Sequence, residues 1–363
     1  MAQVTMKPLS VCMFGFNETE EGGRPWMIRT GLEENGVTIV PCRTGATGMR
    51  AKYRELYRLW QGVGHVDALY VVFLGYYLMP LAWYLARGRG APVILDAFIS
   101  LYDTEVNDRK RVRPGTPHAW FLWCVDWLAC ALADAVVVDT HGHGEYFAKR
   151  YFVRKEKIIV APIGCRSDVF VPRAKSKNAE FTIEFHGRFI PLQGIEHILE
   201  AARALQERGE RVRFEIIGDG QTSSQMQGLA TKLKLANVQF LGTKSHREVA
   251  EAIARADICL GIFGTTEKAL RVIPNKVYEC LSMGKAVVTE RSPAALEYLR
   301  DGEEVRMVPP GDGEALAGAI IELKNDPNLR TQMGARARGI AETTFSTREI
   351  VKDLIAWIES HRV

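Results

Sequence analysis

Residues 181–220 read FTIEFHGRFIPLQGIEHILEAARALQERGERVRFEIIGDG and contain one full unit of the pattern that decides the fold. The apolar periodicity predicts a strand at 181–186, a helix at 195–208 and a second strand at 213–217. A glycine or polar turn separates each element from the next. Strands that alternate with helices in this way are typical of a parallel sheet covered on both faces.

The same unit recurs on both sides of this stretch. Toward the C-terminus we predict helix 223–235, strand 238–241, helix 247–255 behind the capping box of Ser245 and Glu248, strand 258–262, helix 276–283 and strand 286–289. Toward the N-terminus we predict strand 9–14, a helix that opens at Pro25 and closes before Gly36, and strand 135–138. The pattern therefore predicts an α/β protein with two Rossmann-like, doubly wound parallel-sheet domains. We expect them to face each other across a cleft, with ligands bound beyond the carboxyl ends of the strands.

Between the two sets of elements the periodicity lapses. Residues 164–180 read GCRSDVFVPRAKSKNAE, which is polar, basic and contains Pro172. The predicted organisation is an N-terminal domain at 1–165, a linker at 166–180, a C-terminal domain at 181–345 and a closing segment at 346–363. That segment is amphipathic at helical spacing, and it either crosses back to the N-terminal domain or caps the C-terminal one.

Composition restricts the class of function. A chain of 363 residues with 47% hydrophobic and 25% charged residues can bury two cores, and its formal charge of +4 does not favour nucleic acid as a partner. The seven scattered cysteines contain no Cys-x-x-Cys pair, and the first ten residues lack signal-peptide features, so we expect a cytoplasmic protein. His141 and His143 have no third ligand nearby in the sequence, so no metal site is expected.

Two apolar stretches bear on membrane contact. Residues 68–86 carry no charge, but Gly75 and Pro80 favour a buried strand, a turn and a helix over a membrane span. Residues 119–133 contain three tryptophans and Asp126 and are too short to span. A core helix is the preferred interpretation there, and contact with a membrane surface is the alternative.

The first candidate site is FHGRFIPLQGI at 185–195, directly after the first strand of the C-terminal domain. Gly187 permits close backbone approach, and Arg188 stands where a guanidinium can grip phosphate oxygens at two points. A diphosphate leaving group needs such a clamp. A structural salt bridge of Arg188 is the alternative.

The second candidate site is IPNKVYE at 273–279, where a loop enters a helix. Asn275 suits the N-cap, so the free amides of Lys276 and Val277 would point at an anion together with the helix dipole. Glu279 lies one turn inside and can accept hydrogen bonds from ribose hydroxyls. A capped helix with a solvated Glu279 is the alternative.

Together these motifs resemble the retaining GT-B glycosyltransferases of family four. Three further segments agree with the resemblance: IIGDG at 216–220, which contains Gly218, VQFLG at 238–242, and PIG at 162–164 leading to VFVP at 169–172. The resemblance implies a nucleotide diphosphate sugar as donor and no metal or other cofactor. It also implies that Arg188 holds the diphosphate, that amides near Asn275 meet the distal phosphate and the sugar, and that Glu279 binds ribose.

The chain departs from the family pattern at two positions. The family usually has a lysine five residues beyond the arginine, where this chain has Gln193, and we expect Lys276 to supply the missing charge. The family's paired glutamates are spaced Glu-x7-Glu, but Arg271 stands eight residues before Glu279 and would add charge at the diphosphate instead.

The N-terminal domain would bind the acceptor, and its candidate loop lies in PVILDAFISLYDT at 92–104. Asp96 follows the predicted strand directly, and Asp103 lies farther along. Either would orient an acceptor hydroxyl or stabilise positive charge on the sugar ring, with turn-forming aspartates as the alternative. Gly15, in the turn after the first strand, would admit the diphosphate from the other side.

The resemblance therefore implies retaining transfer of a sugar to a saccharide or lipid-linked acceptor, in the synthesis of cell-surface polysaccharide or glycoconjugate. Two alternatives stay open: a non-hydrolysing sugar-nucleotide epimerase and a catalytically silent partner subunit. The basic runs at 109–113 and 149–157 either are solvated loops or face anionic lipid or a polyprenyl diphosphate acceptor, which would place the protein peripherally on the inner face of the cell membrane.

Overall fold

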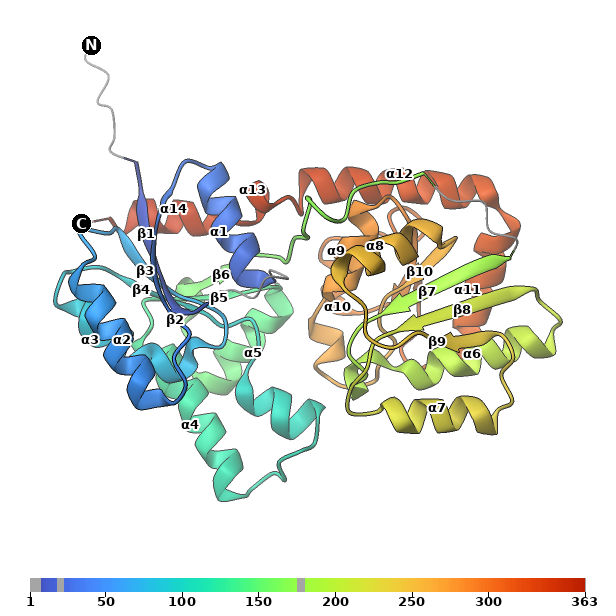
Figure 1. Ribbon diagram of the computed structural model, residues 1–363, viewed down its shortest axis with the longest axis horizontal. Helices are drawn as coiled ribbons and strands as arrows, with labels where there is room; N and C mark the ends of the chain where they lie inside the picture. Colours follow the sequence, from blue (N-terminus) through green and yellow to red (C-terminus); the bar gives the residue numbers. More distant parts are fainter. Residues whose placement is uncertain (1–7, 18–22, 175–179, 363) are drawn as a thin grey trace, which may run out of the picture. The chain divides into compact units, whose positions relative to one another are not determined.

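The computed structural model describes residues 8–17, 23–174 and 180–362, which form two α/β units (Figure 1). Described residues up to 106, residues 110–163 and the C-terminal segment from 346 belong to the first unit. Residues 107–109 and the described residues from 164 to 345 belong to the second. The closing segment therefore packs with the N-terminal part of the chain, against α1 and β6.

In the first unit all six strands are parallel, in the order β2-β1-β3-β4-β5-β6. The strands are β1 (Ser10–Phe16), β2 (Thr38–Thr44), β3 (Ala68–Val71), β4 (Val93–Asp96), β5 (Ala135–Val138) and β6 (Ile158–Val160). The α-helices are α1 (Arg24–Glu34), α2 (Met49–Gln61), α3 (Met79–Arg87), α4 (Pro117–Leu132), α5 (His141–Tyr151), α13 (Thr347–Ile350) and α14 (Lys352–Ser360). No helix in the described part of the chain combines the length and hydropathy needed to cross a membrane.

The second unit repeats this plan with the parallel order β12-β11-β10-β7-β8-β9. Its strands are β7 (Phe181–His186), β8 (Val212–Ile217), β9 (Val238–Phe240), β10 (Ile258–Leu260), β11 (Ala286–Glu290) and β12 (Arg306–Val308). Its α-helices are α6 (Ile195–Glu207), α7 (Ser223–Lys232), α8 (His246–Arg255), α9 (Asn275–Ser282), α10 (Pro293–Leu296), α11 (Gly313–Asn325) and α12 (Pro327–Thr343).

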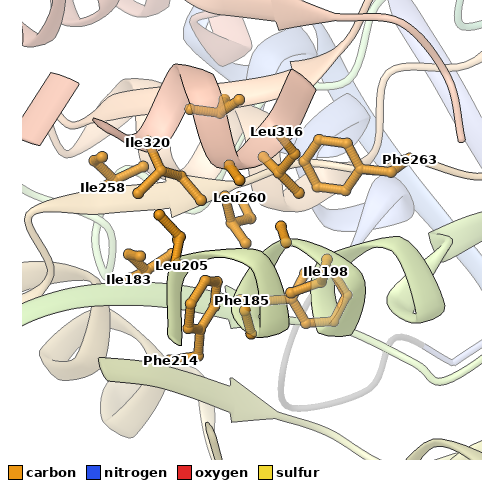
Figure 2. Packing of buried hydrophobic residues seen from close by; sticks show 14 of the residues in the cluster. Ile183, Phe185, Ile198, Leu205, Phe214, Ile258, Leu260, Phe263, Leu316 and Ile320 are labelled. Carbon is orange, nitrogen blue, oxygen red and sulfur yellow. The ribbon is translucent and has the colours of Figure 1, made fainter. Parts of the chain in front are cut away.

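Packing in the core of the second unit orients the side chains of β7. Ile183 and Phe185 of β7 pack with Ile198 of α6 and Leu316 of α11, so these two helices cover one face of the sheet (Figure 2). Helix α9 lies on the other face, where its Glu279 contacts His186 of β7. Residues of β7 therefore alternate between an apolar face and the face toward α9.

The element boundaries agree with the sequence-based expectations in most places, and the capping box at Ser245 and Glu248 is present. Several boundaries shift by one or two residues, and three elements differ more. Strand β3, which was expected to reach Leu74, stops at Val71, and the backbone turns at Leu74, whose φ is +66°. Helix α7 stops at Lys232 because Lys234 is left-handed. The terminal helix is broken at Val351 into α13 and α14.

Candidate functional site

At the carboxyl end of β7 two backbones cross closely, and both glycines predicted there have the conformation that glycine favours. Gly187 has φ +150° and donates its amide to the Ile217 carbonyl at 3.0 Å. A β-carbon on Gly218, whose φ is +133°, would lie 1.9 Å from the Gly187 carbonyl oxygen. This crossing leaves Arg188 exposed just beyond the strand, and its side chain has no ion pair among the described residues.

Lys276 lies beside Gln193 and is buried, at 4% exposure. Its ammonium donates a hydrogen bond to the side-chain oxygen of Gln193 and lies 3.8 Å from the centre of the Phe185 ring. A β-carbon on Gly187 would lie 3.0 Å from the Lys276 Nζ, so the absence of a side chain there makes room for the ammonium. The charge expected from Lys276 is therefore placed at Gln193, although Lys276 is far along the chain.

Burial lowers the pKa of Lys276 to about 7, although the nearby Glu184, Cys280 and Glu279 favour its charged form. An amine in this environment is easily neutralised when the site is empty. An anion bound beside it would favour the ammonium again, because an opposite charge raises the pKa of an amine.

Glu279 is held in place by a histidine that the sequence analysis did not select. His186 bonds through Nδ1 to Glu184 at 2.8 Å and through Nε2 to Glu279 at 2.7 Å. Burial lowers the pKa of His186, but attraction and hydrogen bonding to the two carboxylates outweigh it and raise the pKa to about 10. His186 is therefore protonated at neutral pH and donates to both carboxylates, which orients Glu279.

A signal for this network was present in the sequence. Glu184 and His186 alternate with apolar residues in a strand that was predicted to be buried. Side chains two residues apart in a strand lie on the same face, and a buried charge needs a partner. That face looks toward α9, which carries Glu279.

The predicted N-cap is wrong by one residue. Pro274 is the N-cap of α9, with an extended backbone, and Asn275 is the first helical residue, is exposed and makes no capping hydrogen bond. The Val277 amide is bonded to the Pro274 carbonyl at 2.9 Å and is not free for an anion. Arg271, on the preceding loop, lies 3.4 Å from Glu267.

In the first unit, Asp96 is part of a buried ion pair. The Arg24 Nε donates to Asp96 Oδ1 at 2.7 Å, and another guanidinium nitrogen donates to the Ala161 carbonyl at 3.0 Å. Burial raises the pKa of Asp96 while Arg24 opposes that rise. Asp96 is thus fully buried, and its Oδ1 holds α1 against β4 through Arg24.

Asp103 is also buried, and its backbone amide donates a hydrogen bond to the Ser100 hydroxyl oxygen at 2.9 Å. Direct contact of Asp96 or Asp103 with an acceptor therefore stays a prediction. Gly15 lies within β1 and not in the turn expected after it, because the strand continues to Phe16. Its φ is +147°, and a β-carbon there would lie 2.5 Å from the Val72 side chain, so this position of the strand requires glycine for packing.

One cluster of side chains has spacing compatible with a metal ion. Ligand atoms of Glu184, Cys259 and Cys280 lie within 4.8 Å of one another, and all three residues are buried. Glu184 already accepts a hydrogen bond from protonated His186. We therefore assign this cluster to the interior of the second unit, and the expectation of a site without metal stays a prediction.

Comparison with known families agrees with this two-unit architecture. Residues 169–340 match the family described as "Glycosyl transferases group 1", and residues 9–164 match the "Glycosyl transferase 4-like domain". The chain belongs to the group 1 glycosyltransferases. The two matches meet near residue 165 and leave only the ends and a short central stretch of the chain unmatched.

Among curated relatives, the lipopolysaccharide core biosynthesis glycosyltransferase LpsE of Rhizobium meliloti (strain 1021) is 29% identical over 224 residues, which is 61% of this chain and 62% of that protein. The chain matches less than two thirds of the length of its curated relatives. Sucrose-phosphate synthase from Thermosynechococcus elongatus has a similar structure, with a TM-score of 0.72, 15% identity and 98% coverage of both chains. Anabaena HepE in complex with UDP and glucose has a TM-score of 0.69 and 15% identity, covering 97% of this chain and all of HepE. These likenesses establish the GT-B fold.

Proposed function

We propose that this protein transfers a sugar from a nucleotide diphosphate donor to a hydroxyl group of a saccharide or lipid-linked acceptor, with retention of configuration. The observation that carries the proposal is the pair of cationic groups at the carboxyl edge of the second sheet, the exposed Arg188 and the buried Lys276 at Gln193. Family membership and the neighbour crystallised with UDP and glucose support this class of donor.

In the proposed reaction, the leaving diphosphate is the group whose charge grows most. Arg188 would grip two of its oxygens, and the Lys276 ammonium would add a second positive charge beneath it. Glu279, oriented by His186, would accept hydrogen bonds from the ribose hydroxyls. No protein nucleophile is needed, because the departing diphosphate can take the proton of the acceptor hydroxyl on the same face of the sugar.

The relative named for lipopolysaccharide core biosynthesis supports an acceptor of the cell envelope. We propose that the protein works in the cytoplasm in the synthesis of surface polysaccharide or glycoconjugate, in peripheral contact with the membrane that carries the acceptor. The two alternatives, an epimerase and a silent subunit, remain outcomes of the test.

The test is thermal stabilisation of the purified protein by UDP, GDP, dTDP and ADP. A nucleotide at a hundred times its Kd should raise the stability of the second unit by about 2.7 kcal/mol. Arg188→Ala and Glu279→Ala should lose this stabilisation, whereas Arg211→Ala, an exposed arginine elsewhere in the second unit, should keep it. With the matching nucleotide sugar, Arg188→Ala should lower kcat by about 10² or more.

Two results would overturn the proposal. Stabilisation by none of the nucleotides would favour a silent subunit. Conversion of the donor sugar without any acceptor would favour an epimerase.

A further inference from the structure

Helix α4 of the first unit presents an unusual outer surface. Surface helices of water-facing proteins normally carry charged residues on their outer side. Between Pro117 and Leu132 the only residue of formal charge is Asp126, and it faces inward. The outer side instead carries Trp120, Phe121, Trp127 and Leu128, which are between 40% and 62% exposed.

The inward orientation of α4 is firmly fixed. Asp126 accepts hydrogen bonds from the amides of Leu101 and Tyr102 at 3.1 and 2.9 Å, and from the hydroxyls of Ser100 and Tyr151 at 2.8 and 2.9 Å. Rotation of the helix to hide its aromatic residues would break all four bonds and leave a buried carboxylate without partners. The exposed aromatic residues are therefore a built feature of the fold.

Neighbouring elements extend the same surface. Tyr77, after β3, stacks on Phe121 with ring centres 6.3 Å apart, and Tyr84 of α3 is also exposed. Helices α3 and α4 pack against each other. We define the α4 face as Leu74, Tyr77, Trp120, Phe121, Trp127 and Leu128. It contains six of the thirteen large apolar side chains that are exposed in the described part of the chain.

Positive charge adjoins this face at the start of α4. The loop that leads into the N-cap at Thr116 carries the exposed side chains of Lys110, Arg111 and Arg113. Arg111 lies 3.8 Å from Glu105, which offsets part of that charge. Tryptophan and tyrosine favour the boundary between lipid head groups and acyl chains, and lysine and arginine favour the anionic surface above it.

We propose that the α4 face docks on an anionic lipid surface, with the aromatic side chains inserted at the acyl boundary and the 110–113 loop against the head groups. The choice of lipid over a second protein rests on the combination of aromatic residues with adjoining cations. This inference rests on the proposed function only for the biological role of membrane binding. Docking itself needs no nucleotide sugar.

The test is co-sedimentation of the full chain with vesicles of phosphatidylcholine alone or mixed with phosphatidylglycerol. We expect binding to the mixed vesicles that weakens with salt, and more than about tenfold weaker binding for Trp120→Ser/Trp127→Ser. Lys110→Ser/Arg113→Ser should weaken binding to the anionic vesicles alone. Phe152→Ser removes an aromatic residue that is 74% exposed outside the α4 face, and it should bind like the original protein.

A second measurement reports on the face directly. Cys124 is exposed on α4 and the other six cysteines are buried, so a polarity-sensitive fluorophore can be attached there. Its emission should shift to the blue with anionic vesicles. The proposal is overturned if the protein stays in the supernatant, if the tryptophan variant sediments as well as Phe152→Ser, or if light scattering shows that the face joins two copies while vesicles leave the probe unchanged.

Discussion

Lys276 and His186 of the second unit should change the stability of that unit in opposite directions over the same pH range. Burial takes the pKa of Lys276 from its ordinary 10.5 to about 7, and two carboxylates take that of His186 from 6.5 to about 10. At about 1.4 kcal/mol per pH unit, each change is worth on the order of 5 kcal/mol of folding free energy.

The two signs follow from which state holds the proton more tightly. The folded state binds the Lys276 proton more weakly than the unfolded chain does, so this residue makes stability rise as the pH rises from 7 to 10.5. The folded state binds the His186 proton more strongly, so its stabilisation is complete below pH 6.5 and is lost as the pH rises to 10. In the natural protein these two pH dependences should nearly cancel.

Single substitutions should therefore reveal opposite slopes. Between pH 6.5 and 10, the second unit of Lys276→Met should lose stability while that of His186→Gln gains it, each by about 5 kcal/mol. For a unit of this size, such a change moves Tm by roughly 10–20 °C. Scanning calorimetry at half-unit steps of pH would measure it, and only the transition of the second unit should move.

Two control proteins complete this experiment. The stability of the double variant should change as little with pH as that of the natural protein. The stability of Arg211→Ala should have the same pH dependence as that of the natural protein. A Lys276→Met curve parallel to that of the natural protein from pH 7 to 10 would refute the reasoning, because it would mean that the amine keeps its proton in the folded state.

Three further outcomes can be checked on the same material. Binding of the nucleotide diphosphate at pH 8 should take up about one proton at Lys276, which calorimetry in two buffers of different ionisation enthalpy measures and Lys276→Met should abolish. Gly194→Ala should destabilise the second unit by more than about 1 kcal/mol, because φ at Gly194 is +62° and the added carbon would lie 2.4 Å from a backbone carbonyl carbon. The control Gly228→Ala, in the open middle of α7, should raise Tm slightly. Arg24→Met should lower the free energy of unfolding of the first unit by about 3–5 kcal/mol, because it removes the cation that pairs with the buried Asp96 carboxylate. Thermal unfolding measures this loss.

The sequence was most informative about features that depend on neighbouring residues in the chain. The strand at 135–138 and the start of α6 at Ile195 were predicted at the residues where they lie, because apolar periodicity and glycine turns are local signals. The N-cap of α9 was misplaced because Pro274 and Asn275 both suit a helix start, and only the backbone of the preceding loop decides between them.

It was least informative about partners that the fold brings together from afar. Nothing near Asp96 indicates that Arg24, 72 residues earlier, fills the space around its carboxylate. In the same way, the role of His186 depends on Glu279, which is 93 residues later and on another element. Charged residues in a buried strand predict that a partner exists, but the identity of that partner follows from the order of the strands.

The contact between Gln193 and Lys276 depends on both local and distant information. The sequence shows a lysine missing from one motif and an extra one in another, 83 residues away, and the fold brings the two side chains into contact. The contact needs a position without a side chain at Gly187, an acceptor at Gln193 and a long flexible amine from α9. Because the attraction of an anion depends on where a positive charge lies and not on which residue carries it, we propose that the departure from the family pattern preserves the charge and moves its origin to the helix that also holds Glu279.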